Sequence, residues 1–177
     1  MPYKGSYVWR IRQKIGHDLL VIPSADAIAV RDDGALLMIY NRDANDWFFP
    51  GGYVEEGQTS DECAARELLE EGGLDAKPED MVPFALCSGY QVIYANGDKT
   101  EPFTQTFYTT KWRDVGDSDL DASEIAERRW VPVDEVKRVS KDKRILDIVQ
   151  AYQDHRRSGG YAMINCKGDV YDNSTQN

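Results

Sequence analysis

Cysteine and histidine are scarce in this chain of 177 residues. The three cysteines, Cys63, Cys87 and Cys166, are odd in number and widely spaced. The sequence therefore predicts neither a disulfide framework nor a zinc site of the CxxC kind. The two histidines, His17 and His155, are too far apart in the sequence to suggest a metal pair, and we assign neither a role. A reducing compartment fits this composition best, and we expect a cytoplasmic protein.

Long hydrophobic runs and an excess of positive charge are also missing. No run of about 18 apolar residues occurs that could span a bilayer, and the start, MPYKGSYVWRIRQKIGHD, lacks the apolar core of a secretory signal. With 21 Lys and Arg against 31 Asp and Glu, the formal net charge is −10. This charge argues against a nucleic acid polymer or an anionic membrane surface as a partner. A phosphate-bearing substrate would need a cation to bridge it to such a protein.

The length fits one domain with a sizeable core. We expect three parts, which are a helical extension over 1–19, a main domain over 20–157 and a polar tail over 158–177. In the extension, a helix is indicated by the spacing of Tyr7, Val8, Ile11 and Ile15. That helix would dock on its own domain or on a second subunit, in a homodimer, with a membrane-surface helix as the alternative. The tail is either disordered or forms a strand pair through YAMINCKGDVYD.

Turn signals and apolar spacing outline the main domain. The dipeptides Asp33-Gly34 and Asn96-Gly97 each predict a tight hairpin turn between two strands. The stretch EIAERRWVPVDEV is typical of a strand that leads into a short helix, and KDKRILDIVQAYQDHRR of a last core helix. The order of strands, helix, strands and helix predicts an α+β fold or a layered α/β sandwich.

The stretch between the two hairpin signals contains an acidic helix. Thr59 and Glu62 have the spacing of a capping box, and Gly72-Gly73 favour a left-handed ending, so we expect a helix over 60–71. One side of it is apolar, with Ala64, Ala65, Leu68 and Leu69. The small alanines would let this helix lie close to a sheet. Cys63 is expected to be a small buried residue rather than a nucleophile.

The other side of this helix concentrates negative charge. Glu67, Glu70 and Glu71 stand at i, i+3 and i+4 and therefore share one face. Like charges at this spacing repel one another and cost a few tenths of a kcal/mol per pair. The face is either a solvated surface or a site for a hard cation such as Mg²⁺ or Mn²⁺.

Residues around this face resemble the signature of the Nudix hydrolases, G-x5-E-x7-R-E-U-x-E-E-x-G-U, where U is apolar. Eight of the nine fixed positions match, at Gly52, Arg66, Glu67, Leu68, Glu70, Glu71, Gly73 and Leu74. Trp47, Pro50 and the stretch AERRWVPVDEV also resemble parts of a Nudix domain, so the resemblance covers about residues 20–150. The N-terminal helix resembles an extension of some bacterial members. The family implies an α/β/α sandwich with a mixed β-sheet, a bound divalent metal and hydrolysis of a diphosphate bond.

The resemblance also implies roles for individual residues. The metal ligands, to Mg²⁺ or Mn²⁺, would be Gly51 through its carbonyl, Glu67, Glu70 and Glu71. Arg66 would hold one of these carboxylates in position. The general base has no fixed place in the signature, and Glu124 and Glu127 are candidates for the base or a fourth ligand, with Glu127 favoured. Either could instead be an ordinary surface charge.

Gln58 departs from the signature, which has glutamate there. Glutamine keeps one carbonyl acceptor but loses the charge, so a hydrogen bond could survive while attraction to a cation weakens. This departure allows a non-catalytic nucleotide-binding module as an alternative to an enzyme. We favour the enzyme because the principal metal ligands are complete.

The substrate is less well defined by the sequence. Tyr90 and Tyr94 are four apart on an expected strand, so their rings would share a face and either stack on a base or pack in the core. Tyr90 lies near the place where diadenosine-polyphosphate hydrolases of the family have a tyrosine. We expect a small-molecule nucleotide, first a nucleoside diphosphate linked to another group, as in ADP-ribose. A nucleoside triphosphate, cleaved to release pyrophosphate as by MutT-like enzymes, is the alternative.

Overall fold

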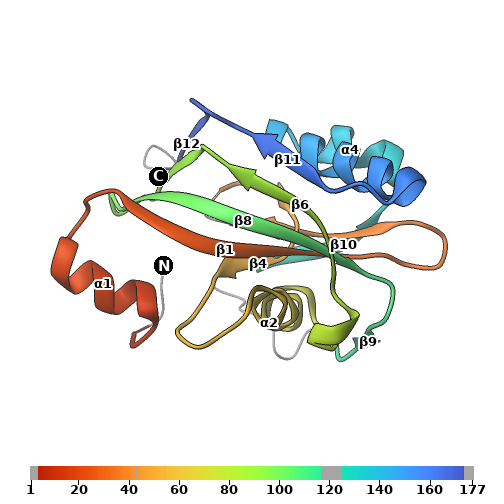
Figure 1. Ribbon diagram of the computed structural model, residues 1–177, viewed down its shortest axis with the longest axis horizontal. Coiled ribbons are helices and arrows are strands. Elements are labelled where there is room, and N and C mark those ends of the chain that lie inside the picture. Colours follow the sequence, from red (N-terminus) through yellow and green to blue (C-terminus); the bar gives the residue numbers. More distant parts are fainter. Residues whose placement is uncertain (1–3, 43, 117–124, 174–177) are drawn as a thin grey trace.

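A parallel pair of long strands, β1 (Leu20–Ala29) and β8 (Lys99–Thr109), runs through the middle of the molecule (Figure 1). The computed structural model describes residues 4–42, 44–116 and 125–173. β8 also pairs antiparallel with β6 (Val82–Ser88) and β7 (Gln91–Ile93), and β4 (Gly51–Tyr53) pairs antiparallel with the other edge of β1. The sheet is therefore mixed, as the family resemblance implied.

A second sheet lies beside the first, with β2 (Leu36–Asn41) between β10 (Ile125–Val131) and β3 (Asp46–Phe48). The Asp33-Gly34 turn that leads into β2 forms as predicted, with the Gly34 N–H donating to the Arg31 carbonyl at 2.9 Å. The predicted hairpin is wrong, however, because β1 and β2 share only an isolated bridge and then enter different sheets. Both edges of β1 are already paired with β4 and β8. The Asn96-Gly97 turn does join an antiparallel pair, β7 and β8.

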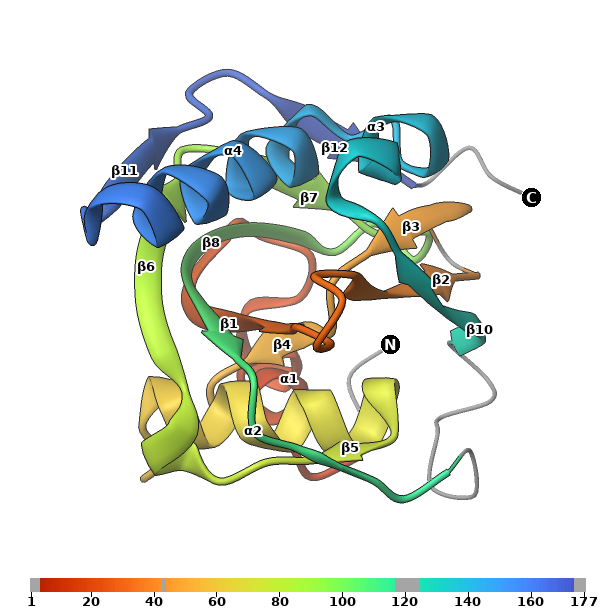
Figure 2. The same ribbon diagram turned by 90° about the vertical axis from the view of Figure 1, so that its right-hand side faces the viewer.

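Helices cover opposite sides of the strands, with α4 (Lys143–Ser158) above and α2 (Ser60–Gly72) below in Figure 2. Small side chains of α2 pack on the alanines of β1, among them Ala25 and Ala27. α4 packs with Phe84 of β6 in a second, larger cluster. The layering confirms the α/β/α sandwich. The remaining short elements are β5 (Leu74–Asp75), η1 (Pro78–Asp80), β9 (Arg113–Asp114), η2 (Val133–Glu135) and α3 (Val136–Val139).

The ends of α2 follow from its capping residues. At the start, the Thr59 N–H donates to Glu62 Oε2 at 2.8 Å. At the end, Gly73 takes a left-handed conformation (φ 64°), and its N–H donates to the carbonyls of Leu68 and Leu69. A Cβ at Gly73 would lie 2.5 Å from the Gly116 carbonyl oxygen, so only glycine fits. Gly72 is the last helical residue, so the helix is one residue longer than predicted.

The C-terminal residues extend the first sheet. β11 (Ala162–Asn165) pairs parallel with β6, and β12 (Val170–Asp172) pairs parallel with β7. The predicted pairing of these two strands with each other is wrong. The segment between them follows the β6–β7 connection, where the Cys166 N–H donates to the Ser88 carbonyl at 2.9 Å. Each tail strand thus lies along a free edge of the main sheet.

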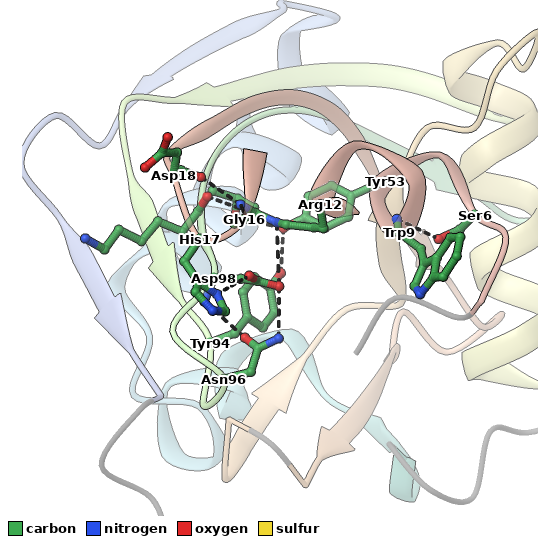
Figure 3. Close-up of polar contacts among 12 residues, drawn as sticks. Ser6, Trp9, Arg12, Gly16, His17, Asp18, Tyr53, Tyr94, Asn96 and Asp98 are labelled. Carbon is green, nitrogen blue, oxygen red and sulfur yellow. Dashed lines mark hydrogen bonds and ion pairs between the residues drawn. The ribbon is translucent and has the colours of Figure 1, made fainter. Parts of the chain in front are cut away.

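The N-terminal helix α1 (Tyr7–Ile15) docks on its own domain through a buried cation (Figure 3). Arg12, 8% exposed, donates to the carbonyl oxygens of Gly16, Asp18 and Lys99 at 3.0, 2.7 and 2.7 Å. Its Nε lies 3.5 Å from the carboxylate of Asp98. Docking on its own domain was one of the three possibilities that the sequence left open for this helix, although the sequence pattern pointed to apolar contacts. Within the described ranges, no helix is long and apolar enough to cross a membrane.

Candidate active site

Arg66 organises the acidic face of α2. Its guanidinium lies 2.7 Å from Glu67 Oε1 and 2.7 Å from Glu70 Oε2, and it donates to the Tyr53 carbonyl at 3.1 Å. Glu67 is buried, whereas the Glu70 side chain is about half exposed. Burial disfavours the charge of Arg66, but the neighbouring Glu67 and Glu70 carboxylates raise its pKa. The guanidinium thus offsets part of the repulsion on this face.

Two glycines let the backbone of β4 approach these carboxylates. The Gly51 N–H donates to Glu71 Oε2 at 2.9 Å. A Cβ at Gly52 would lie 2.1 Å from Glu67 Oε1, and one at Gly51 would lie 2.2 Å from Asp26 Oδ1. Real Cβ atoms do not come so close to oxygen, so a side chain at either position would displace a neighbouring carboxylate, and one at Gly51 would also meet the Ala25 carbonyl oxygen at 2.9 Å.

The donor chemistry of this face fits a divalent cation. Three carboxylates beside an exposed backbone turn are hard oxygen donors of the kind that Mg²⁺ and Mn²⁺ prefer. In the described part of the chain, no three acidic, histidine or cysteine side chains converge into a ready-made metal cage. Arg66 holds Glu67 and Glu70 instead, and the Gly51 N–H holds Glu71. The residues therefore fit the metal in the chemistry of their donors, and the carboxylates would have to turn from Arg66 and the Gly51 N–H to meet on one cation.

Two hollows meet at this face. The first hollow, of about 330 Å³, lies between α1, β4 and the β7–β8 turn. The second hollow, of about 720 Å³, lies between β2 and β3, the start of α4 and the C-terminal residues 168–173. The residues that line both include Asp26, Gly51, Glu71, Tyr90, Tyr94 and Arg144. Glu67 and Glu70 line the first hollow only. A ligand bound at the acidic face could extend in two directions.

A buried ion pair at the junction of the hollows was missed by sequence reasoning. Arg144 Nη1 donates to Asp26 Oδ2 at 2.9 Å, and the side chains are 12% and 11% exposed. Burial raises the pKa of Asp26, and Arg144 offsets this only in part. The Arg144 Nε is buried and lacks a hydrogen-bond acceptor among the described residues. The one available signal was Asp26 itself, a charge within an otherwise apolar strand sequence.

The two tyrosines flank β7 rather than lying on it, which corrects the expectation of a shared strand face. Tyr90 is 3% exposed, its hydroxyl bonds Thr104 Oγ1 at 2.5 Å, and its ring lies under the Arg144 guanidinium at 5.1 Å. The Tyr94 hydroxyl bonds that of Tyr53 at 2.5 Å (Figure 3). Burial raises the pKa of both tyrosines. Both line the hollows, but Tyr90 is packed as a core residue.

Of the two general-base candidates, Glu127 is described by the structure, and it does not line the hollows at the acidic face. Glu127 lies on β10, is about half exposed, pairs with Arg129 at 2.8 Å, and lines neither described hollow. Glu124 falls outside the described residues. Gln58 also lines neither hollow, and its side-chain oxygen accepts the Glu55 N–H at 3.2 Å. Gln58, which departs from the signature, therefore stabilises a backbone turn through its side-chain oxygen.

Cys63 is buried on α2, as expected. Its Sγ lies 3.6 Å from the Gly52 carbonyl oxygen. Burial, reinforced by the Glu67 carboxylate, raises the pKa of this thiol to about 12. At neutral pH the thiol is therefore protonated and is not a nucleophile.

Known proteins share this sequence pattern and this fold. A family model described as NUDIX domain matches residues 21–152. "Phosphatase NudJ" of Shigella boydii is 29% identical over 113 residues, which are 63% of this chain and 69% of that protein. A MutT protein from Bacillus halodurans has a similar structure, with a TM-score of 0.55, 21% identity, and coverage of 73% and 80% of the two chains. A C. elegans Ap4A hydrolase gives a TM-score of 0.52 at 15% identity, covering 77% and 98%. With its acidic helix, glycine turn and sandwich in place, this chain belongs to the Nudix hydrolases, which act on pyrophosphate bonds and generally use divalent cations.

Proposed function

We propose that this chain cleaves the diphosphate bond of a nucleoside diphosphate that is linked to a second group, with Mg²⁺ or Mn²⁺ as the cofactor. The observation that carries this proposal is the position of the acidic face where the two hollows meet. A diphosphate at this junction has room on one side for a nucleoside and on the other for the second group. A nucleoside triphosphate, the MutT-type alternative, would place only phosphate beyond the cleaved bond.

The residues at the acidic face have different roles in the proposed reaction. Glu67, Glu70, Glu71 and the Gly51 carbonyl would hold the cation, which neutralises phosphate charge, polarises phosphorus and activates water. Arg66 keeps two of the carboxylates oriented through its contacts at 2.7 Å. Arg144 lines both hollows, so its guanidinium is placed to contact a diphosphate oxygen. A positive charge there would stabilise the bound diphosphate.

The Glu70→Gln variant tests this assignment. Because the Glu70 side chain is 53% exposed, we expect the fold to be kept while kcat falls by about 100-fold or more, through loss of a metal-bearing charge. Turnover would be followed with and without Mg²⁺, with products identified by mass spectrometry. Glu56→Gln is the matched control, since Glu56 pairs with Arg10 outside both described hollows. Full activity of Glu70→Gln with Mg²⁺ would refute the site.

The products distinguish the alternatives. A nucleoside monophosphate plus a phosphorylated partner supports the proposed reaction, whereas a nucleoside monophosphate plus pyrophosphate supports the MutT-type reaction. Binding of nucleotides with no Mg²⁺-dependent turnover would favour the non-catalytic module instead.

A further inference from the structure

The C-terminal residues 168–173 form one wall of the second hollow, although they follow the part of the chain that matches the family model. β12 lies beside β7 in Figure 1, and the main chain fixes it there. The Gln91 N–H donates to the Asp169 carbonyl at 3.0 Å, and the Asn173 N–H donates to the Ile93 carbonyl at 2.8 Å. The ring of Tyr171 meets that of Tyr90 edge-on at 5.8 Å. The wall is thus tied to the strand that shapes both hollows.

The side chains that line the second hollow include more acidic than basic ones. Its acidic lining residues are Asp26, Asp46, Glu71, Asp142, Asp169 and Asp172, and its basic ones are Lys141, Lys143 and Arg144. Arg144 is paired with Asp26, so these two charges offset each other, and Glu71 belongs to the proposed cation site. The remaining acidic residues, Asp46, Asp142, Asp169 and Asp172, still outnumber Lys141 and Lys143, and Lys143 is paired with Asp147 outside the lining. Further phosphate groups would meet this excess of negative charge, whereas hydroxyl groups would find acceptors.

One of these acidic residues is buried at the wall itself. The Asp142 side chain is 4% exposed, and its Oδ1 accepts the Arg144 N–H at 2.7 Å. Burial, the charge of Asp142 and a side-chain hydrogen bond with Asp142 raise the pKa of Tyr171. Asp142 is thus satisfied within the protein and ties the start of α4 to the wall. The acceptors that a ligand hydroxyl can reach are the less buried carboxylates of the lining, among them Asp169.

We propose that residues 168–173 are a specificity-determining wall for the group beyond the diphosphate. This wall selects an uncharged group that bears hydroxyls, such as a sugar, over a group that carries further phosphates. The inference rests on the proposed function, because it assumes that the diphosphate lies at the junction of the hollows. It gives the C-terminal segment, which lies outside the family-matched region, a role in selecting the substrate.

Asp169 offers the cleanest test because it lies on this wall and makes its main-chain bond through the carbonyl, which substitution keeps. The kcat/KM values for ADP-ribose and for diadenosine tetraphosphate would be measured with Mg²⁺. For Asp169→Lys we expect the ratio of the first to the second to fall about tenfold, and for Asp169→Asn about threefold, as repulsion of phosphate is removed. Glu79→Lys makes the same change of charge on an exposed turn outside both described hollows, and should leave the ratio unchanged.

An unchanged ratio in Asp169→Lys, with an unfolding temperature like that of the wild type, would overturn the inference. Absence of turnover in the wild-type protein would instead count against the proposed function. In that case the two Kd values, measured by calorimetry, replace kcat/KM in the same comparison. A wild-type preference for the tetraphosphate, by either measure, would also contradict the proposed selection.

Discussion

The ion pair of Asp26 and Arg144 joins residues that lie 118 positions apart in the chain. Two buried charges are costly to desolvate, and the pair is stabilising only while both members are present. Because burial raises the pKa of Asp26 above its unfolded value, ionising this group costs stability as the pH rises from about 4 through the folded-state pKa. A site that binds an anion beside Asp26 is a functional reason to keep Arg144 there.

Replacing Arg144 by Met should therefore have two separable effects. The unpaired Asp26 should lower the free energy of unfolding by about 3–5 kcal/mol, and loss of the diphosphate contact should lower kcat/KM by about 10- to 100-fold. In the double variant Asp26→Asn/Arg144→Met, stability should recover in large part while kcat/KM stays low. Urea unfolding and steady-state kinetics measure the two effects. If activity recovers together with stability, Arg144 acts only through Asp26.

Local spacing was enough to find some site residues but not others. Glu67, Glu70 and Arg66 are neighbours on one helix, so their sequence positions predicted that they meet. Asp26 and Arg144 meet only because the fold brings the start of α4 to β1, which no local pattern reveals. The prediction of Glu127 as the general base gains no support, because Glu127 lines neither described hollow.

At the scale of elements, Arg12 is the one buried charge of α1, beside the buried apolar residue Val8. Arg12 satisfies three backbone carbonyls, including that of Lys99 on β8, and its side chain is 6% exposed. Arg12→Ala should lower the free energy of unfolding by about 2–4 kcal/mol in urea unfolding. Arg10→Ala on the same helix should cost less than about 1 kcal/mol, because Arg10 is exposed and only pairs with Glu56. Equal losses for the two variants would mean that the buried contacts do not anchor the helix.

Elements with their own signals were predicted best. The start of α2 and both glycine turns follow from capping and turn chemistry within a few residues. Strand partners were predicted poorly, because pairing depends on which sheet edges are free. β1 had both edges occupied, so β2 left it, and the tail strands took the open edges of β6 and β7. The sequences of the strands themselves predict neither the separation of β2 from β1 nor the pairing of the tail strands.

At the scale of the whole molecule, segments from both ends of the chain complete the hollows. α1 lines the first hollow through Val8 and Arg12, and residues 168–173 line the second. Both segments lie outside the matched residues 21–152. The core of the family therefore supplies the acidic face, while the terminal segments shape the space on either side of it. In the proposed function, this division places the chemistry in the core and the selectivity in the terminal segments.

The three cysteines can report whether the tail opens separately from the core. All three are buried and free, and burial raises the pKa of Cys63 and Cys87 to about 12 and that of Cys166 to a lesser extent. At pH 8 a thiol reagent should thus label the native protein only through opening. Cys166 connects β11 and β12, which have one strand partner each, so we expect it to be labelled at least tenfold faster than the other two. Peptide mass spectrometry over a time course measures this order, and equal rates at all three would mean that the tail opens only when the whole domain unfolds.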